Sequence, residues 1–229
     1  MDDATRDVII FPGTGSFGSE FQPMVRTLRP NVRILRYPWR YEQTSHTDTP
    51  SFHDAAVSFV PQLRDISEKE PILFGHSFGA YMAYTLAAAL ELACCQIGGL
   101  VIVGANAPHL IDGSALLPRS SEEIEAYWTT VDPGLFERMP SHEWKDILID
   151  TTRKELNMLS DFHASDFGRL CCPIFAASGD EDPLVTENGL TGWGDYTTER
   201  MSIRRFCGGH TNLLATNEFI TWVKEITHH

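Results

Sequence analysis

The sequence predicts an α/β fold in which a mostly parallel sheet is flanked by helices. Short apolar segments rich in β-branched residues alternate with helical patterns along the 229 residues, as is typical of parallel sheets that are buried on both faces. The alternation is interrupted at about residues 109–170, where helix-forming and acidic residues occur without a convincing strand. We expect a single domain, residues 1–229, with this segment as a helical lid over the carboxyl edge of the sheet.

Six segments have the composition of buried strands. The first ends at Pro12-Gly13 and the second near Pro38, and both ends carry residues that interrupt strands. In chain order the expected strands are 8–11 (VIIF), 32–35 (VRIL), 72–74 (ILF), 99–104 (GLVIVG), 173–178 (PIFAAS) and 201–206 (MSIRRF).

Two helix starts are predicted from capping boxes, in which a serine and a residue three positions later satisfy free backbone N–H groups. They are formed by Ser19 with Gln22 and by Ser51 with Asp54. Pro61 predicts a kink in the second of these helices, because proline has no N–H to donate.

Two further helices follow from the pattern of apolar residues. Segment 78–93 is rich in alanine and apolar on nearly all sides, which predicts a buried helix. Segment 218–226 has an amphipathic pattern and is expected to be the last helix.

Composition excludes several classes of function. The net charge of -13 argues against binding to nucleic acid or to an anionic membrane. No apolar run is long enough for a membrane span, and the polar, acidic start is unlike a signal peptide. The five cysteines are odd in number and lack metal-site spacing, so we expect buried, reduced thiols in a cytoplasmic protein: Cys94, Cys95, Cys171, Cys172 and Cys207.

Ser77 is the candidate nucleophile. It lies in GHSFG, directly after an expected strand and before an expected helix, which is the context of a nucleophile elbow. Gly75 and Gly79 lack Cβ atoms and allow strand and helix to approach closely around the serine. An ordinary strand-to-helix turn that happens to contain serine is the alternative. On the first reading, the backbone N–H of Phe78 faces a developing oxyanion.

A serine needs a base to take its proton, and His210 is the candidate. It lies in FCGGHTNLL, after the last strand, where a loop can reach a serine on a central strand. His76 is adjacent to Ser77 and points away from it, so we expect a structural role for it.

The base needs a carboxylate to orient it, and the loop ASGDEDPLV supplies candidates. Asp182 is the first choice and Asp180 the reserve. The order serine, acid, histidine along the chain is the order expected with this elbow. A solvated acidic turn is the alternative.

The second oxyanion donor is expected from the glycine-rich loop FPGTGSFGSEF, residues 11–21. GTGSFG within it also fits the pattern of a dinucleotide-binding loop. The acid expected at the end of the second strand of such a site is missing, since the sequence there is RILRYPWR.

Together these motifs resemble the type II thioesterases, the editing thioesterases of polyketide and nonribosomal peptide synthesis. IIFPGTGSFGSEF, RYPWR, LFGHSFGAYMAY, GANAPHL, SGDEDPLV and GGHTNLL occur in the family's order over roughly residues 8–226. The resemblance implies an α/β-hydrolase fold and favours Asp182, because the family's acid takes the last position of G-x-x-D. It implies the Thr14 backbone as the other oxyanion donor, although FPGTGS departs from the family's F-P-x-A-G-G.

The resemblance also implies the reaction. Ser77 would remove acyl groups from the phosphopantetheine arm of an acyl or peptidyl carrier protein, with no metal or dissociable cofactor. Alternatives are a small-molecule carboxylesterase, a cyclising release-type thioesterase and a non-catalytic hydrolase-fold binding protein.

Five arginines and no acid lie between Phe21 and Tyr41, and they offer a docking patch for an acidic carrier protein. The alternative is a solvated helix face with strand ends. The five are Arg26, Arg29, Arg33, Arg36 and Arg40.

Overall fold

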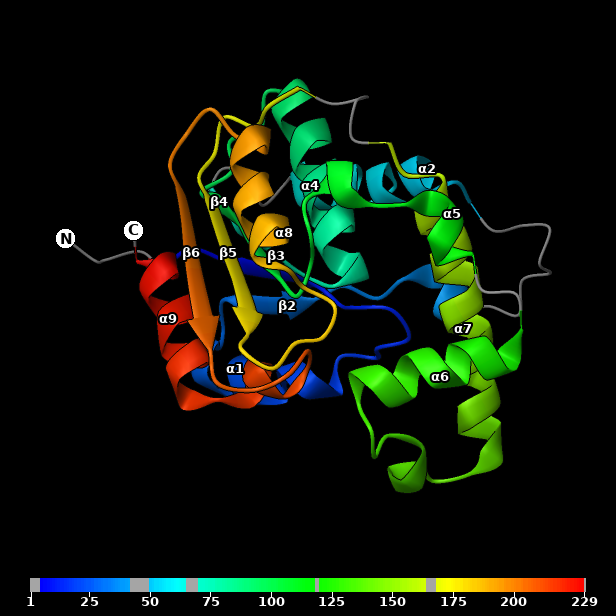
Figure 1. Ribbon diagram of the computed structural model, residues 1–229. Coiled ribbons are helices and arrows are strands. Elements are labelled where there is room, and N and C mark those ends of the chain that lie inside the picture. Colours follow the sequence, from blue (N-terminus) through cyan, green and yellow to red (C-terminus); the bar gives the residue numbers. More distant parts are fainter. Residues whose placement is uncertain (1–4, 42–49, 65–69, 118–119, 164–167, 229) are drawn as a thin grey trace.

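A six-stranded parallel sheet forms the centre of the molecule (Figure 1). The computed structural model describes residues 5–41, 50–64, 70–117, 120–163 and 168–228. The strand order is β2-β1-β3-β4-β5-β6, and each neighbouring pair is parallel. The strands are β1 (Val8–Phe11), β2 (Val32–Ile34), β3 (Ile72–His76), β4 (Gly99–Val103), β5 (Ile174–Gly179) and β6 (Met201–Phe206). The predicted α/β fold is confirmed.

The predicted strands differ from the observed ones only at their ends. β3 runs two residues further than expected, because Gly75 and His76 still pair with Ile102 and Val103 of β4. The strand therefore continues to the residue before Ser77, which ties the start of the turn firmly to the centre of the sheet.

Helices cover both faces of the sheet (Figure 1). Alternate residues of β1 enter different cores: Ile9 packs with α2, α3 and α4, and Ile10 packs with α1 and α9. This alternation follows from the two-residue period of a strand. The helices are α1 (Gln22–Leu28), α2 (Phe52–Val57), α3 (Val60–Arg64), α4 (Phe78–Leu92), α8 (Glu187–Thr191) and α9 (Asn217–Thr227).

Neither predicted capping box forms in full. Ser51 caps α2, with its Oγ accepting the Asp54 N–H at 3.1 Å, but the Asp54 carboxylate accepts the Ser51 hydroxyl at 2.8 Å and not the Ser51 backbone N–H. Ser19 instead lies inside a short 3-10 turn, η1 (Ser19–Phe21), and does not cap α1. Gly18, at φ 88°, turns the chain into η1, so α1 continues from that turn without a side-chain cap.

Pro61 separates two helices rather than kinking one. α2 ends at Val57 and α3 begins at Val60. Because proline has no N–H to donate, it is tolerated in the first turn of a new helix and not in the middle of a continuous one. The predicted helices at 78–93 and 218–226 are present as α4 and α9, and α4 is buried along most of its length.

The segment 109–170 is helical where the structure describes it. It contains α5 (Gly113–Leu116), α6 (Ser121–Val131) and α7 (His142–Ser160), and Figure 1 shows them grouped beside the sheet. The short turns η5 (Pro108–Leu110) and η6 (Phe136–Arg138) adjoin them, and η2 (Pro38–Arg40), η8 (Gly192–Tyr196) and η9 (Asn212–Ala215) lie elsewhere. We call residues 109–170 the insertion; that it acts as a lid stays a prediction.

The expectation of buried cysteines is wrong for three of the five. All five are free thiols, but Cys94, Cys171 and Cys207 are exposed and only Cys172 is fully buried. The exposed ones lie in turns and loops after α4, before β5 and after β6, where the chain returns to solvent. Among the described helices, none is long and apolar enough to cross a membrane.

Candidate active site

Ser77 occupies a strained turn between β3 and α4. Its backbone has φ 54° and ψ -122°, a conformation that a residue with a side chain rarely adopts. A Cβ on Gly75 would lie 2.4 Å from the Gly79 carbonyl oxygen, and one on Gly79 would lie 2.0 Å from that of Phe11. Only glycine fits these two positions, so the turn can be tight enough to push the serine out of the strand.

Asp182 and His210 are joined by a buried hydrogen bond. His210 Nδ1 lies 2.8 Å from Asp182 Oδ2, and both side chains are almost completely buried. The other carboxylate oxygen accepts the Leu184 N–H at 2.9 Å. Burial raises the pKa of Asp182, but the hydrogen bond and charge of His210 outweigh it, and the net pKa is lowered. An ionised Asp182 accepts a hydrogen bond from the Nδ1–H of His210 and so leaves Nε2 unprotonated and free to act as a base.

Asp180 has a different contact. It is exposed, and its Oδ1 accepts the Gly208 N–H at 2.9 Å. Asp180 therefore holds the loop that carries His210, whereas Asp182 contacts the imidazole itself.

His76 supports His210 from the other side. Its Nε2 lies 2.8 Å from the His210 carbonyl oxygen, so Nε2 carries the proton and donates it. Burial, followed by the neighbouring His210, lowers the pKa of His76 to about 3. His76 is therefore neutral near pH 7 and fixes the backbone of His210, in keeping with the structural role expected for it.

Two backbone N–H groups border Ser77. Phe78 is the first residue of α4, where an N–H has no partner within the helix. Thr14, in the loop after β1, is 4% exposed and lines the same cavity as Ser77. Within the described part of the chain, neither N–H bonds to a protein acceptor. Both are thus available to an oxygen atom bound beside Ser77.

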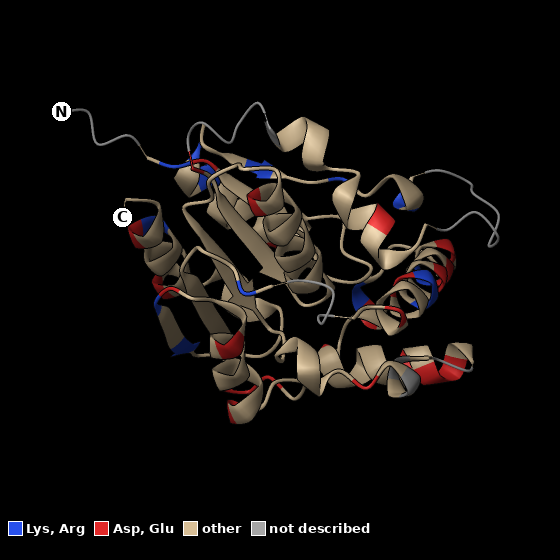
Figure 2. Cartoon of the chain, turned by 90° about the horizontal axis from the view of Figure 1, so that it is seen from above, with Lys and Arg blue, Asp and Glu red and all other residues tan. Residues whose placement is uncertain are grey.

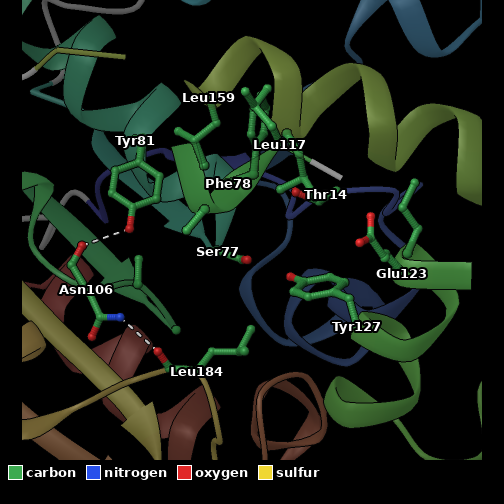
Figure 3. Close-up of a pocket in the computed structure, with 15 residues that line it drawn as sticks. Thr14, Ser77, Phe78, Tyr81, Asn106, Leu117, Glu123, Tyr127, Leu159 and Leu184 are labelled. Atoms are coloured by element: carbon green, nitrogen blue, oxygen red, sulfur yellow. Dashed lines mark hydrogen bonds between the residues drawn. The ribbon is translucent and has the colours of Figure 1, made fainter. Parts of the chain in front are cut away.

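Two cavities meet at Ser77. The first has a volume of about 570 Å³ and is mainly apolar, with walls from Tyr81, Leu156, Leu159 and Leu184 (Figure 3). The second has about 520 Å³ and contains His210 together with Trp128, Leu135, Met139 and Trp144. We call them the acyl-side and His210-side cavities. A substrate with two long arms, joined at the atom that Ser77 attacks, fits this arrangement.

Tyr127 lines both cavities and was missed by the sequence analysis. It lies on α6, and Figure 3 shows its hydroxyl and Ser77 pointing toward each other. Burial, followed by the charge of Asp182, raises the pKa of Tyr127 to about 12. No local pattern marks this residue, because its neighbours in the site are distant in sequence.

The sequence as a whole matches a known family. Residues 6–228 match the sequence model of the thioesterase domain. The chain belongs to the thioesterase family. This thioesterase is 25% identical over 210 residues to a probable cadicidin biosynthesis thioesterase of Streptomyces griseus, covering 91% of the chain but 58% of that relative's length.

Solved structures of thioesterases have the same fold. The type II thioesterase BorB, from the borrelidin biosynthetic cluster, superposes with a TM-score of 0.80 at 26% identity, covering 98% of this chain and 93% of BorB. RedJ, a thioesterase of the prodiginine pathway in Streptomyces coelicolor, has a TM-score of 0.83 at 22% identity, covering 97% and 91%. The resemblance to type II thioesterases and the α/β-hydrolase fold inferred from the sequence are confirmed.

The predicted patch of five arginines is smaller than expected. The side chain of Arg40 is 2% exposed and pairs with buried Glu155, so it cannot contact a partner. The other four remain exposed: Arg26, Arg29, Arg33 and Arg36.

Proposed function

We propose that this chain is a serine thioesterase that hydrolyses acyl groups from the phosphopantetheine arm of carrier proteins, in an editing role. The observation that carries the proposal is the convergence on Ser77 of a strained elbow and two cavities, one of which is lined by His210, the partner of Asp182. The cytoplasm is the compartment proposed for it, where free thiols persist.

In the proposed mechanism, Ser77 attacks the thioester carbonyl while His210 Nε2 takes its proton. The Thr14 and Phe78 N–H groups hold the oxyanion. The C–S bond then breaks easily, because the pKa of a thiol is only about 8.5, and the leaving sulfur takes the proton from His210 Nε2. The neutral His210 then takes a proton from water, whose oxygen attacks the acyl-enzyme, and returns it to Ser77 as the acid is released. The chain supplies every group in these steps; the pantetheine belongs to the substrate.

The cavities suggest how the thioester lies. The leaving sulfur must be near the imidazole that can protonate it, and His210 lines only one of the two cavities. The pantetheine arm is therefore assigned to the His210-side cavity and the acyl group to the other, the acyl-side cavity.

A basic surface is proposed to meet the carrier protein. Four arginines are exposed on a chain of net charge -13: Arg26 on α1, Arg29 at its C-terminal cap, and Arg33 and Arg36 at the edge of the sheet. Figure 2 shows many acidic residues on the helices of the insertion. A groove of about 220 Å³ between α1 and β2 contains Phe17, which also lines the His210-side cavity. An acidic partner bound there would have its arm near the mouth of that cavity.

The central test loads carrier proteins with acetyl, malonyl and aminoacyl groups and follows their release by intact mass. We expect release by the wild-type protein and at least a 10³-fold slower release by Ser77→Ala. Release by Ser77→Ala at the wild-type rate would contradict the mechanism. Activity on oxygen esters alone would favour a carboxylesterase, and no turnover of any ester would favour a binding protein.

The docking surface has its own test. Arg26→Glu with Arg29→Glu should slow release from carrier-bound thioesters on the order of tenfold, and leave small thioesters unaffected. The matched control is Arg204→Glu with Arg205→Glu on β6, at the opposite edge of the sheet. Equal effects of the two double variants would exclude this surface.

A further inference from the structure

A buried carboxylate of the insertion contacts the loop that carries Thr14. Glu155, on α7, is fully buried, and its Oε2 accepts the Gly15 N–H at 2.9 Å. Its Oε1 accepts the Trp39 Nε1–H at 3.0 Å and the Arg40 Nε–H at 2.5 Å. A buried charge is costly unless it is paired and hydrogen-bonded. The partners of Glu155 come from the loop after β1 and from η2, the short turn after β2.

Arg40 holds the same loop by its carbonyl groups. Its Nη2 donates to the Gly13 carbonyl oxygen at 2.8 Å, and its Nη1 donates to that of Ser16. The guanidinium lies 4.4 Å from the centre of the Tyr37 ring. The Tyr37 hydroxyl donates to the Pro12 carbonyl oxygen at 3.1 Å. The side chains of Tyr37 and Arg40 in the RYPWR segment therefore form hydrogen bonds with the loop on both sides of Thr14.

The carbonyl that Arg40 binds belongs to the same peptide unit as the Thr14 N–H. In a trans peptide the C=O and N–H groups point in opposite directions. Fixing the Gly13 oxygen on Arg40 consequently fixes the direction of the Thr14 N–H. The next peptide is fixed in turn, because its N–H, that of Gly15, is bound to Glu155.

The loop needs this external support because its glycines make it pliable. Gly15 has φ 65°, in the left-handed region, and a Cβ there would lie 2.4 Å from Cδ1 of Leu148 on α7. The loop is thus pressed against α7 as well as bonded to it. Without that contact, glycine residues at 13 and 15 would leave many backbone conformations accessible.

We propose that Arg40 and Glu155 are positioning residues that aim the Thr14 N–H at the oxyanion, so that the oxyanion hole is complete only while α7 is seated on the loop. The inference rests on the proposed function, because it needs an oxyanion to form beside Ser77. On this proposal, the insertion helps to stabilise the oxyanion in addition to forming the cavity walls.

The test is Glu155→Gln, which keeps the shape of the side chain and removes its charge. With an acyl-N-acetylcysteamine substrate, kcat should fall on the order of 10- to 100-fold and KM should change little, as when one oxyanion donor is misplaced. Glu125→Gln is the matched control, because Glu125 pairs with Lys145 between α6 and α7, 2.8 Å apart, without touching the loop. It should leave kcat within about twofold.

A second readout separates positioning from general loss of structure. A trifluoromethyl ketone analogue forms a tetrahedral oxyanion on Ser77, whereas the matching thioether only occupies the cavities. Glu155→Gln should lower the affinity for the ketone by the same factor as kcat/KM and leave the affinity for the thioether unchanged. Equal weakening of both ligands, or an unchanged kcat, would overturn the proposal.

Two further measurements test the proposal if Glu155→Gln does not fold or if no thioester is hydrolysed. Trp39→Phe removes the indole N–H that Glu155 accepts and keeps an aromatic ring to stack on Tyr37. It replaces Glu155→Gln in the same comparison if circular dichroism shows that Glu155→Gln does not fold. If the wild-type protein hydrolyses no thioester, the proposed function fails by itself. The rate at which a fluorophosphonate labels Ser77 still reports the oxyanion hole, and a rate equal in wild type and variant would then contradict the positioning role.

Discussion

Asp182 Oδ2 lies 2.8 Å from His210 Nδ1, whereas Asp180, two residues earlier, accepts the Gly208 N–H. Proline at 183 and the Leu184 N–H bound to Asp182 hold this carboxylate in place. In the acidic loop ASGDEDPLV, Asp182 therefore orients the imidazole and Asp180 holds the loop of His210, an assignment that the sequence alone leaves open.

We predict that Asp182→Asn lowers kcat on the order of 10³- to 10⁴-fold, because an amide cannot hold His210 in the tautomer that leaves Nε2 unprotonated. Asp180→Asn should cost less than about tenfold, because it loosens only the loop. Steady-state kinetics on one small thioester compares the two. A larger loss for Asp180→Asn would reverse the assignment of the orienting acid.

Removing the Tyr127 hydroxyl should free Ser77. The Tyr127 hydroxyl faces Ser77 (Figure 3), and a hydrogen bond between the two hydroxyls would have to break before Ser77 attacks, at a cost of about 1 kcal/mol. Tyr127→Phe should therefore raise the rate of fluorophosphonate labelling of Ser77 up to about fivefold. Slower labelling, by tenfold or more, would mean that the hydroxyl acts in the transition state instead.

His76 should make stability depend on pH. Its pKa is about 3 in the folded protein against 6.5 for the free side chain, so the unfolded chain binds a proton that the folded chain does not. Its contribution to stability is present above pH 6.5 and is lost as the pH falls toward 3, at up to about 1.4 kcal/mol per pH unit.

Urea unfolding between pH 6.5 and 4 measures this slope. His76→Gln keeps a donor for the His210 carbonyl and cannot titrate. As the pH is lowered, the free energy of unfolding should therefore fall less steeply in this variant than in the wild-type protein. The same slope in both proteins would show that another group titrates.

The two cavities should respond to different parts of the substrate. Leu159→Phe narrows the acyl-side cavity and should slow octanoyl hydrolysis on the order of tenfold, with acetyl hydrolysis nearly unchanged. Leu135→Phe narrows the His210-side cavity and should raise KM for acyl-pantetheine more than for acyl-N-acetylcysteamine. The reverse pattern would exchange the two assignments.

The elbow could be predicted because it is a local structure. Gly75, Ser77 and Gly79 lie within five residues, and Gly75 is required by its contacts with Gly79 and Ala80 inside the elbow, although Gly79 is required by Phe11 on the neighbouring strand β1. The α/β fold followed for the same reason, since strand and helix periods are visible in short windows. The capping box at Ser19 failed because Gly18, one residue earlier, directs the chain into a 3-10 turn.

The sequence by itself determined the parallel α/β order, the strained serine and the two loops that bring an acid and a histidine to one edge of the sheet. Tertiary structure alone decided that Arg40 is buried, that Tyr127 faces Ser77 and that Glu155 binds Gly15. Gly15, Arg40 and Glu155 are separated by up to 140 residues. Local patterns report which faces of an element are apolar, but a buried charge finds its partners only when distant segments pack together.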